Sequence, residues 1–405
     1  MKKLRDGLPK GAHDACAQQR LTTNWAEYFP GLTKCPPIIY LDLWPFLSYP
    51  LIYATSLEAC YQIIQEKPQP RHGMFAWALL PVNTFVQQLR DMAGRNHEYG
   101  KVFPLYERTV NLTFDIIMRV VVDLRVNERL IRHVKAENIR NITSNEATIR
   151  GILLLHLKSR LGKEMDSTTP RTVIDLALKA LKSESRDAYL QPNDYFFFST
   201  VCWVFYEVYS RPKVLESLRA ELDVLGPDPM LTLAQQPHKL NTLQYITAVI
   251  KEILCLHPLG ATHRLRSSEL NIMYEGITYP TMNALINTSP TALHLRADLW
   301  PRVNEFLPER FIVPEGHPLH PIRNVWRAFE LGNTRCIGEE LAMMEMKLVL
   351  ILTARDMDME FDWVGWNKSQ NRTSPPDMVN GHYMYRVGNG IGTVKDRLPT
   401  RIRLR

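Results

Sequence analysis

The chain has 405 residues, 45% of them hydrophobic, so it can bury a large core and is not a disordered or fibrous protein. Its formal net charge of +7 is small for this length and forms no concentrated basic face, so we expect no nucleic-acid partner. The six cysteines, at positions 16, 35, 60, 202, 255 and 336, form no CxxC pair and no zinc spacing, which argues against a disulfide framework.

The N-terminal segment, residues 1–36, is polar and basic and has no apolar run of the ~20 residues that span a membrane. We therefore predict a segment without a transmembrane anchor. The most apolar stretch, Ile38–Ala54, is interrupted by one aspartate and two prolines, so it predicts two strands, Ile38–Leu41 and Leu51–Tyr53. Peripheral contact of apolar loops with a membrane is left open.

The rest of the chain shows mainly helical periodicity, which predicts a mainly α fold with a minor β-sheet region. A strand pair is expected around Glu275-Gly276, between Leu270 and Ile286, and a polar loop at Asn367–Asp377. The predicted helices cover Phe85–Met92, Leu112–Val122, Val173–Leu181, Phe196–Leu222, Thr242–Leu256 and Cys336–Thr353.

The most informative segment is Phe329-Glu330-Leu331-Gly332-Asn333-Thr334-Arg335-Cys336-Ile337-Gly338. It places Cys336 directly before a run of strong helix formers without proline. Unpaired backbone N–H groups and the positive end of the helix dipole favour a thiolate there. Such a thiolate suits an axial bond to haem iron. Taken alone, Cys336 could equally be an inert buried thiol.

The residues around this cysteine resemble the haem-thiolate loop of the cytochrome P450 monooxygenases. The resemblance rests on Phe329 seven residues before the cysteine, Gly332 four before and Gly338 two after. It implies that Cys336 binds the iron of heme b, with the phenylalanine beside the thiolate and the glycines letting the backbone turn under the porphyrin. Where the family usually has arginine the chain has Thr334, and whether Arg335 reaches a haem propionate is left open.

Three upstream segments resemble the same family and occur in the expected order. Lys251-Glu252-Ile253-Leu254-Cys255-Leu256-His257-Pro258 resembles its K helix, Phe306-Leu307-Pro308-Glu309-Arg310-Phe311 its P-E-R-F segment, and Trp326-Arg327-Ala328-Phe329-Glu330 the loop of fungal members. Residues 37–405 are thus expected to form a P450-like haem-binding domain, truncated relative to the family.

The K helix departs from the family pattern. Its Glu-x-x-Arg motif keeps Glu252 but has Cys255 at the arginine position. The resemblance implies a buried ion network behind the haem, in which Glu252 can now pair only with Arg310. Loss of one partner from a buried charge network typically costs ~3–5 kcal/mol.

Two further departures concern haem and oxygen chemistry. The proton-relay acid and alcohol of the family's central helix are missing from Asp194–Glu207; Ser199 or Thr200 is either a substitute hydroxyl or an ordinary hydroxyl bonded to a backbone carbonyl. The helix that contacts a haem propionate is also missing before Phe85. Haem binding would then depend on Cys336 and on Arg264, which is either a propionate ligand or a plain surface charge.

The resemblance implies a monooxygenase that oxidises a lipophilic small molecule, plausibly a fungal secondary metabolite, with electrons from NADPH through NADPH-cytochrome P450 reductase. It places the enzyme on the cytoplasmic side, with association to the endoplasmic reticulum left open. Catalytic residues beyond the iron ligand are unknown. Two alternatives stand: a degenerate or mis-spliced member with impaired haem binding, and a haem-thiolate isomerase or dehydratase that does not need oxygen activation. A non-enzymatic interaction protein is a remoter reading, to be preferred only if no haem binds.

Overall fold

The structure is a computed structural model of the chain. The structure describes residues 38–41, 51–56, 75–122, 200–258, 262–264, 271–281, 285–332, 335–336, 338–379, 381–387 and 393–405. The predicted helix at Val173–Leu181 lies outside these residues. No helix within the described ranges combines the length and apolar character needed to cross a membrane.

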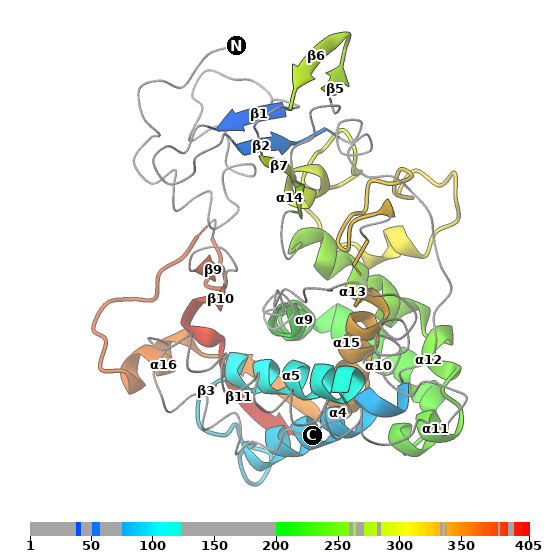
Figure 1. The fold of residues 1–405 in the computed structure, drawn as a ribbon. Helices are drawn as coiled ribbons and strands as arrows, with labels where there is room; N and C mark the ends of the chain where they lie inside the picture. Colours follow the sequence, from blue (N-terminus) through cyan, green and yellow to red (C-terminus); the bar gives the residue numbers. More distant parts are fainter. Residues whose placement is uncertain are drawn as a thin grey trace, which may run out of the picture.

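Helices are the main secondary structure of the described residues and the strands are short, as predicted, and Figure 1 shows the helices gathered around α9, α13 and α15. The α-helices are α4 (Phe75–Asp91), α5 (Tyr106–Val122), α9 (Thr200–Tyr209), α10 (Pro212–Leu222), α11 (Pro229–Gln235), α12 (Lys239–Thr242), α13 (Gln244–Leu256), α14 (Pro290–His294), α15 (Glu339–Thr353) and α16 (Trp363–Ser369). Short 3-10 turns are η2 (Asp223–Leu225), η3 (Pro308–Phe311) and η5 (Lys395–Arg397).

The strands form small, separate sheets. One sheet has the order β1-β2-β7-β4, with β1 (Ile38–Leu41), β2 (Leu51–Ala54), β7 (Leu285–Thr288) and β4 (Thr262–Arg264). A second has the order β3-β11-β8, with β3 (Phe103–Pro104), β11 (Pro399–Leu404) and β8 (Met357–Phe361). Two hairpins pair β5 (Asn271–Tyr274) with β6 (Ile277–Pro280), and β9 (Arg386–Val387) with β10 (Thr393–Val394). In Figure 1 the first sheet lies at the end of the molecule opposite β3 and β11.

The predicted strands at the N-terminus and the predicted hairpin are confirmed. β1 and β2 pair antiparallel, with Ile38 opposite Ala54. β5 and β6 are joined by Glu275 and Gly276, both with positive φ, which is the backbone of a tight two-residue hairpin turn. The hairpin is shorter than the predicted range Leu270–Ile286, because the end of that range belongs to β7, which pairs with β2 and β4.

The prediction of one long helix over Phe196–Leu222 is wrong in one respect, because its described part forms two helices, α9 and α10. The break falls at Pro212, the first residue of α10, which has no N–H to continue α9 and whose ring would clash with a preceding helical turn. Arg211 before it is extended, with φ −125° and ψ 90°, as residues preceding proline usually are. The α9 and α10 axes are therefore set independently.

The bounds of two further predicted elements differ in the structure. The first residues of the loop predicted at Asn367–Asp377 belong to α16, which the Asp362 carboxylate caps by accepting a hydrogen bond from Gly365 N at 2.7 Å. The helix predicted at Phe85–Met92 begins earlier, at Phe75, and runs through Pro81.

The core is built around α15, which is buried on nearly every side. Its buried residues include the continuous run Lys347–Thr353, and the helix contacts α4, α9, α11 and α13. The part Leu348–Leu352 is apolar all round, as is typical of a helix segment in a protein interior. Because Cys336 lies just before α15, this packing fixes the position of the segment that leads to the thiol.

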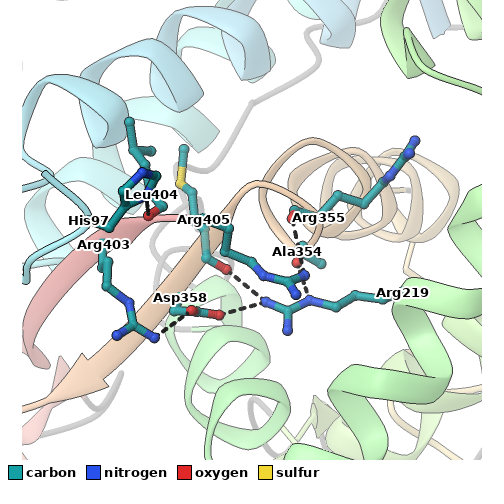
Figure 2. A network of polar contacts seen from close by, with 9 residues as sticks. His97, Arg219, Ala354, Arg355, Asp358, Arg403, Leu404 and Arg405 are labelled. Carbon is teal, nitrogen blue, oxygen red and sulfur yellow. Dashed lines mark hydrogen bonds and ion pairs between the residues drawn. The ribbon is translucent and has the colours of Figure 1, made fainter.

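The C-terminal strand is tied to the helices by an arginine network (Figure 2). Arg219 on α10 donates hydrogen bonds to the backbone oxygens of Ala354, at 2.6 Å, and Met357, at 3.0 Å, and to Asp358 Oδ1 at 2.8 Å. Arg403 on β11 donates to the other oxygen of Asp358 at 2.8 Å. Since one carboxylate joins α10, β8 and β11, the end of α15 is held against the second sheet.

A buried carboxyl in the core predicts a pH-dependent stability. Glu345 on α15 is buried beside Thr113, whose hydroxyl donates to it, and burial raises its pKa to about 7. The folded state therefore holds this proton more tightly than the unfolded chain does, and stability falls as pH rises from about 4.5 through about 7. In Glu345→Gln, which mimics the neutral acid, the gain in unfolding free energy over wild type should grow by roughly 2–3 kcal/mol between about pH 5 and pH 8.

Urea unfolding of both proteins at the two pH values measures this difference. The control is Glu340→Gln, an exposed position on the same helix. A gain that is the same at both pH values in Glu345→Gln would show that the carboxyl is already ionised in the folded protein.

Candidate functional site

The cysteine loop lies between the core residue Phe329 and the start of α15. The backbone N–H of Cys336 donates to Phe329 O at 2.9 Å, and that of Arg335 donates to Gly332 O at 3.0 Å. Gly332 has a φ of 75°, a left-handed conformation that glycine adopts without strain. These two bonds close the chain into a compact turn that presents the thiol.

The helix begins three residues later than predicted. α15 starts at Glu339, and Gly338 is its N-cap, with a φ of −85°. Cys336 therefore precedes the cap instead of occupying the first turn, although Glu339 N still approaches its carbonyl oxygen, at 3.4 Å. The thiol keeps its place near the positive end of the α15 dipole, outside the hydrogen-bonded turns.

Aromatic packing fixes the apolar side of the loop. Phe329 is buried in the main core, and its ring packs edge-on against Trp326 with centroids 6.0 Å apart. The Trp326 indole N–H donates to Lys251 O on α13 at 3.1 Å. Cys336 itself is half-buried, packs against the same core and is not in a disulfide. The loop thus holds a partly shielded thiol in a defined position.

Arg335, a predicted haem-binding residue, has its side chain directed along the protein surface. It forms a bidentate pair with Glu339 in the first turn of α15, with Nη2 2.5 Å from Oε1. The hydrogen bond that it donates to the Glu339 carboxylate raises the pKa of the guanidinium, and the side chain is 40% exposed. Its contact with a haem propionate stays a prediction.

The structure brings Glu252 and Arg310 together behind the loop. Both are buried, with Glu252 Oε2 3.0 Å from Arg310 Nε. The Arg310 guanidinium also donates to four backbone oxygens, those of Pro301, Arg302, Glu305 and Leu307. Leu307 N in turn donates to Glu252 Oε1 at 2.8 Å. The pair therefore organises the 301–310 segment against α13.

Cys255 lies where the family's K helix has an arginine, so Glu252 lacks that second cation. The Cys255 side chain is buried with Trp300 and Val325, and among the described residues no hydrogen bond joins it to the Glu252 carboxylate. Among the described residues, Glu252 Oε2 accepts no hydrogen bond, because Arg310 Nε–H donates to Leu307 O instead. Burial raises the pKa of Glu252 to about 7, against the lowering effect of Arg310. Burial likewise raises the pKa of the Cys255 thiol, which stays protonated.

A second buried charge pair was missed by the sequence analysis. Arg327 Nη1 lies 3.0 Å from Glu330 Oε2, and both residues are buried directly before the cysteine loop. Thr288 on β7 donates to the other oxygen of Glu330. The Arg327 backbone N–H donates to His294 Nε2 at 2.8 Å, while His294 Nδ1 bonds Cys255 O at 3.0 Å.

This arrangement fixes the His294 tautomer and joins the loop to α13 and β7. Because Nε2 accepts a hydrogen bond, the proton is on Nδ1. Burial lowers the pKa of His294 to about 3, so it stays neutral. The sequence signal for this cluster was a pair of opposite charges, Arg327 and Glu330, three residues apart in an otherwise apolar stretch.

Two other predicted residues are placed only in part. Arg264 ends β4, where it is opposite Ile286 of β7, but its side chain lies outside the described residues. Thr200 begins the described part of α9 and is buried, and its hydroxyl has no hydrogen-bond partner among the described residues. Phe196, whose carbonyl would accept that hydroxyl in a continuous helix, lies outside the described residues, as does Ser199.

The described residues fit the axial-ligand side of a haem site. Cys336 offers one sulfur donor, half-buried, at a helix N-terminus and beside a buried phenylalanine, which is the environment that favours a bound thiolate. The left-handed Gly332 lets the backbone turn tightly next to that donor. No described arginine other than Arg335 lies on this loop after Phe329.

Comparison with known proteins points to one family. The family model described as Cytochrome P450 matches residues 198–379. Cytochrome P450 monooxygenase PC-23 of Penicillium crustosum is 36% identical over 207 residues, which cover 49% of this chain and 98% of that protein. Cytochrome P450 monooxygenase polC of Polytolypa hystricis (strain UAMH7299) is 27% identical over 451 aligned positions, covering 90% of this chain and 81% of that protein. This second alignment is longer than the chain, so it contains gaps on this chain's side.

The fold agrees with these relatives. The solved structure "Crystal structure of cytochrome P450DA heme domain" superposes with a TM-score of 0.69 at 16% identity, over 98% of this chain and 96% of that one. At this identity the likeness bears on the fold, and it confirms the predicted class.

Proposed function

Because this chain belongs to the cytochrome P450 family, we propose that it is a haem-thiolate monooxygenase whose iron is bound by Cys336. The observation that carries the proposal is the loop itself: a half-buried thiol held by the Cys336 N–H bond to Phe329 O, ahead of the N-terminus of α15. We also propose that residues 37–405 act together as the haem-binding domain.

The chain's own residues would set the electronic and steric environment of the iron. Haem, when bound, supplies the oxygen-activating chemistry. Cys336 would provide an anionic sulfur ligand, which the dipole of α15 stabilises. Phe329 would keep water from one side of the sulfur, and Gly332 and Gly338 would allow the close turns of the loop. Arg264 and Arg335 are the proposed partners of the haem carboxylates.

The proposed substrate is a lipophilic small molecule, of the secondary-metabolite type made by fungi. The proposed electron donor is NADPH, through NADPH-cytochrome P450 reductase. In support, the relatives PC-23 and polC carry the name monooxygenase and come from fungi. We place the enzyme on the cytoplasmic side, with peripheral contact at the endoplasmic reticulum.

One observation favours the alternative of a member with impaired haem binding. The Glu252 oxygen that faces Arg310 is left without a hydrogen bond, so the support behind the loop is weaker than a full three-residue network. This alternative predicts folded protein with little bound haem.

The test is the absorbance spectrum of the purified protein reduced with dithionite under carbon monoxide. We expect a far red-shifted Soret band, because an anionic sulfur ligand increases electron density on the iron. Cys336→Ser should lose that band completely. The matched control is Cys202→Ala, which changes a buried cysteine of α9 whose sulfur lies 3.4 Å from Thr109 Oγ1, and it should keep the band.

A folded wild-type protein without haem absorbance would reject the proposal in favour of the impaired member. If the red-shifted band is present, product formation with and without the reductase separates two reaction classes. Rearrangement of a peroxide substrate without any reductase would indicate an isomerase, and NADPH-dependent incorporation of one oxygen atom would indicate the monooxygenase.

A further inference from the structure

A cavity of about 520 Å³ is lined by residues of α9, of the C-terminal end of α13 and of the segment that leads into β9. Its lining is mostly apolar and aromatic, with Trp203, Tyr206, Phe306 and Met384 among the residues. Small-molecule sites typically enclose ~300–1,000 Å³ and combine such walls with a few fixed polar groups. None of the described lining residues belongs to the cysteine loop, so the cavity is separate from the residues assigned to the iron.

One polar group of this lining is the imidazole of His257, the residue that directly follows α13. Its backbone N–H donates to Ile253 O at 2.8 Å, and its Nε2 lies 2.7 Å from Glu207 Oε1 on α9. The Trp203 indole stacks on the same ring, with centroids 3.8 Å apart and planes inclined by 15°. The helix end, the carboxylate and the indole therefore hold the imidazole in one orientation.

The proton positions in this pair follow from burial and charge. Burial opposes ionisation of Glu207, but the hydrogen bond from His257 and the positive charge of Arg211 outweigh it and leave the pKa lowered, so Glu207 is a carboxylate. Burial lowers the pKa of His257 against the raising effect of Glu207, so the ring is neutral at pH 7. Since a carboxylate can only accept, Nε2 carries the single ring proton and Nδ1 is a bare acceptor. A carboxylate bonded to one N–H of an imidazole also makes the other nitrogen more basic.

The Nδ1 atom of His257 is accessible. The His257 side chain lines the cavity and is 22% exposed. Its Nδ1 accepts no hydrogen bond from any described residue, and it is not among the unpaired polar atoms that are shielded from solvent. The lining of the cavity thus includes an acceptor of fixed orientation that a ligand with a hydrogen-bond donor can pair.

We propose that this cavity binds a phenol, with the hydroxyl of the ligand donating to His257 Nδ1 and its ring packed against Tyr206 and Phe306. A phenolic O–H is weakly acidic and therefore a stronger donor than an aliphatic alcohol, which suits a basic imidazole nitrogen. Aromatic pairs gain energy beyond the area that they bury, which favours a ring over an alkyl chain against these residues. Glu207 is already bonded to Arg211 and His257, so this part of the lining suits a neutral donor better than a cation. The proposal goes beyond the proposed oxygenase function and does not depend on bound haem.

The test measures binding of para-ethylphenol and of para-ethylanisole to the purified full-length chain by isothermal titration calorimetry. The two probes share the ring and the ethyl group, but the anisole oxygen carries a methyl group and cannot donate a hydrogen bond. We expect the phenol to bind about tenfold more tightly, because the anisole would cover Nδ1 without pairing it. His257→Phe keeps an aromatic ring beside Trp203 but has no acceptor, so it should lose this preference. The matched control His238→Phe changes an exposed histidine outside the cavity and should keep it.

A second measurement keeps the result interpretable if His257→Phe folds poorly. The nitrogen NMR signal of an unprotonated imidazole nitrogen moves when that atom accepts a hydrogen bond. In the wild-type chain labelled at histidine, para-ethylphenol should move one such signal and para-ethylanisole should not. Leu295→Trp, which adds bulk to the cavity lining from a partly exposed position, should weaken binding of both probes and abolish this movement.

The proposal is independent of the iron site, and one more variant makes that visible. Cys336→Ser should bind para-ethylphenol as wild type does, which separates this site from any failure of haem binding. Equal affinity of the wild-type chain for the two probes, or no movement of a histidine nitrogen signal, overturns the proposal. So does a preference that a folded His257→Phe protein keeps.

Discussion

Replacing Arg310 with methionine is expected to lower the free energy of unfolding by about 3–5 kcal/mol, because it removes one partner of a buried ion pair. The change strands the buried Glu252 carboxylate and leaves four backbone oxygens of the 301–307 segment without their donor. The carboxyl has a pKa of about 7 even with the arginine present, so it can escape part of this cost by taking up a proton. The loss should therefore be larger at pH 8 than at pH 6.

Urea unfolding at the two pH values measures the effect. The matched control is Arg302→Met, which breaks an ion pair with Glu305 in which both side chains are 52% exposed. Exposed pairs are worth at most ~1 kcal/mol, so this variant should differ little from wild type. If Arg310→Met and Arg302→Met lose equal stability, the buried pair does not support the segment behind the cysteine loop.

Replacing Arg327 with methionine is expected to cost a similar amount, about 3–5 kcal/mol, and to change the haem spectrum as well. Arg327 has no exposed side-chain surface and is the cation beside the buried Glu330. Glu330 has a φ of 56°, a left-handed conformation that is strained for a non-glycine residue and must be held by its contacts. Since Glu330 follows Phe329 directly, loss of this pair should also disturb the turn that places Cys336.

Unfolding free energy and the carbon monoxide band are to be measured on the same preparations. Arg397→Met is the control, because Arg397 pairs with Glu107 at the surface, where its side chain is 58% exposed. A folded Arg327→Met protein with an undiminished band would contradict the link between this pair and the cysteine loop, even if its stability were reduced.

Local sequence pattern was enough for the elements themselves. Apolar periodicity predicted α5, α13 and α15, and the Glu275-Gly276 pair predicted the β5–β6 hairpin, because each depends on residues within a few positions of one another. Two of the errors came from single residues whose local effect was underestimated: Pro212 divides the long helix, and Gly338 delays the start of α15.

The candidate site was predictable to the extent that it is contiguous in sequence. Cys336 and its flanking Phe329 and Gly332 lie within eight positions, so their spacing could be compared with a known loop. Glu252 and Arg310 are far apart in the sequence and were connected only through that resemblance. Arg327 with Glu330 was within reach of the sequence but not found, because charged residues in a loop are usually solvent-exposed and burial cannot be read from a short segment.

The sequence by itself thus determined the mainly helical class, the helices and strands that local pattern specifies, and the cysteine loop that identifies the family. The tertiary structure alone decided which ionisable groups are buried and which side chains they contact. It pairs Glu345 with Thr113, links His294 to Arg327, and brings His257, at the end of α13, to Glu207 of α9. The reason is physical: these partners come from separate elements, and their pKa values and pairing energies depend on desolvation, which exists only after the elements have packed.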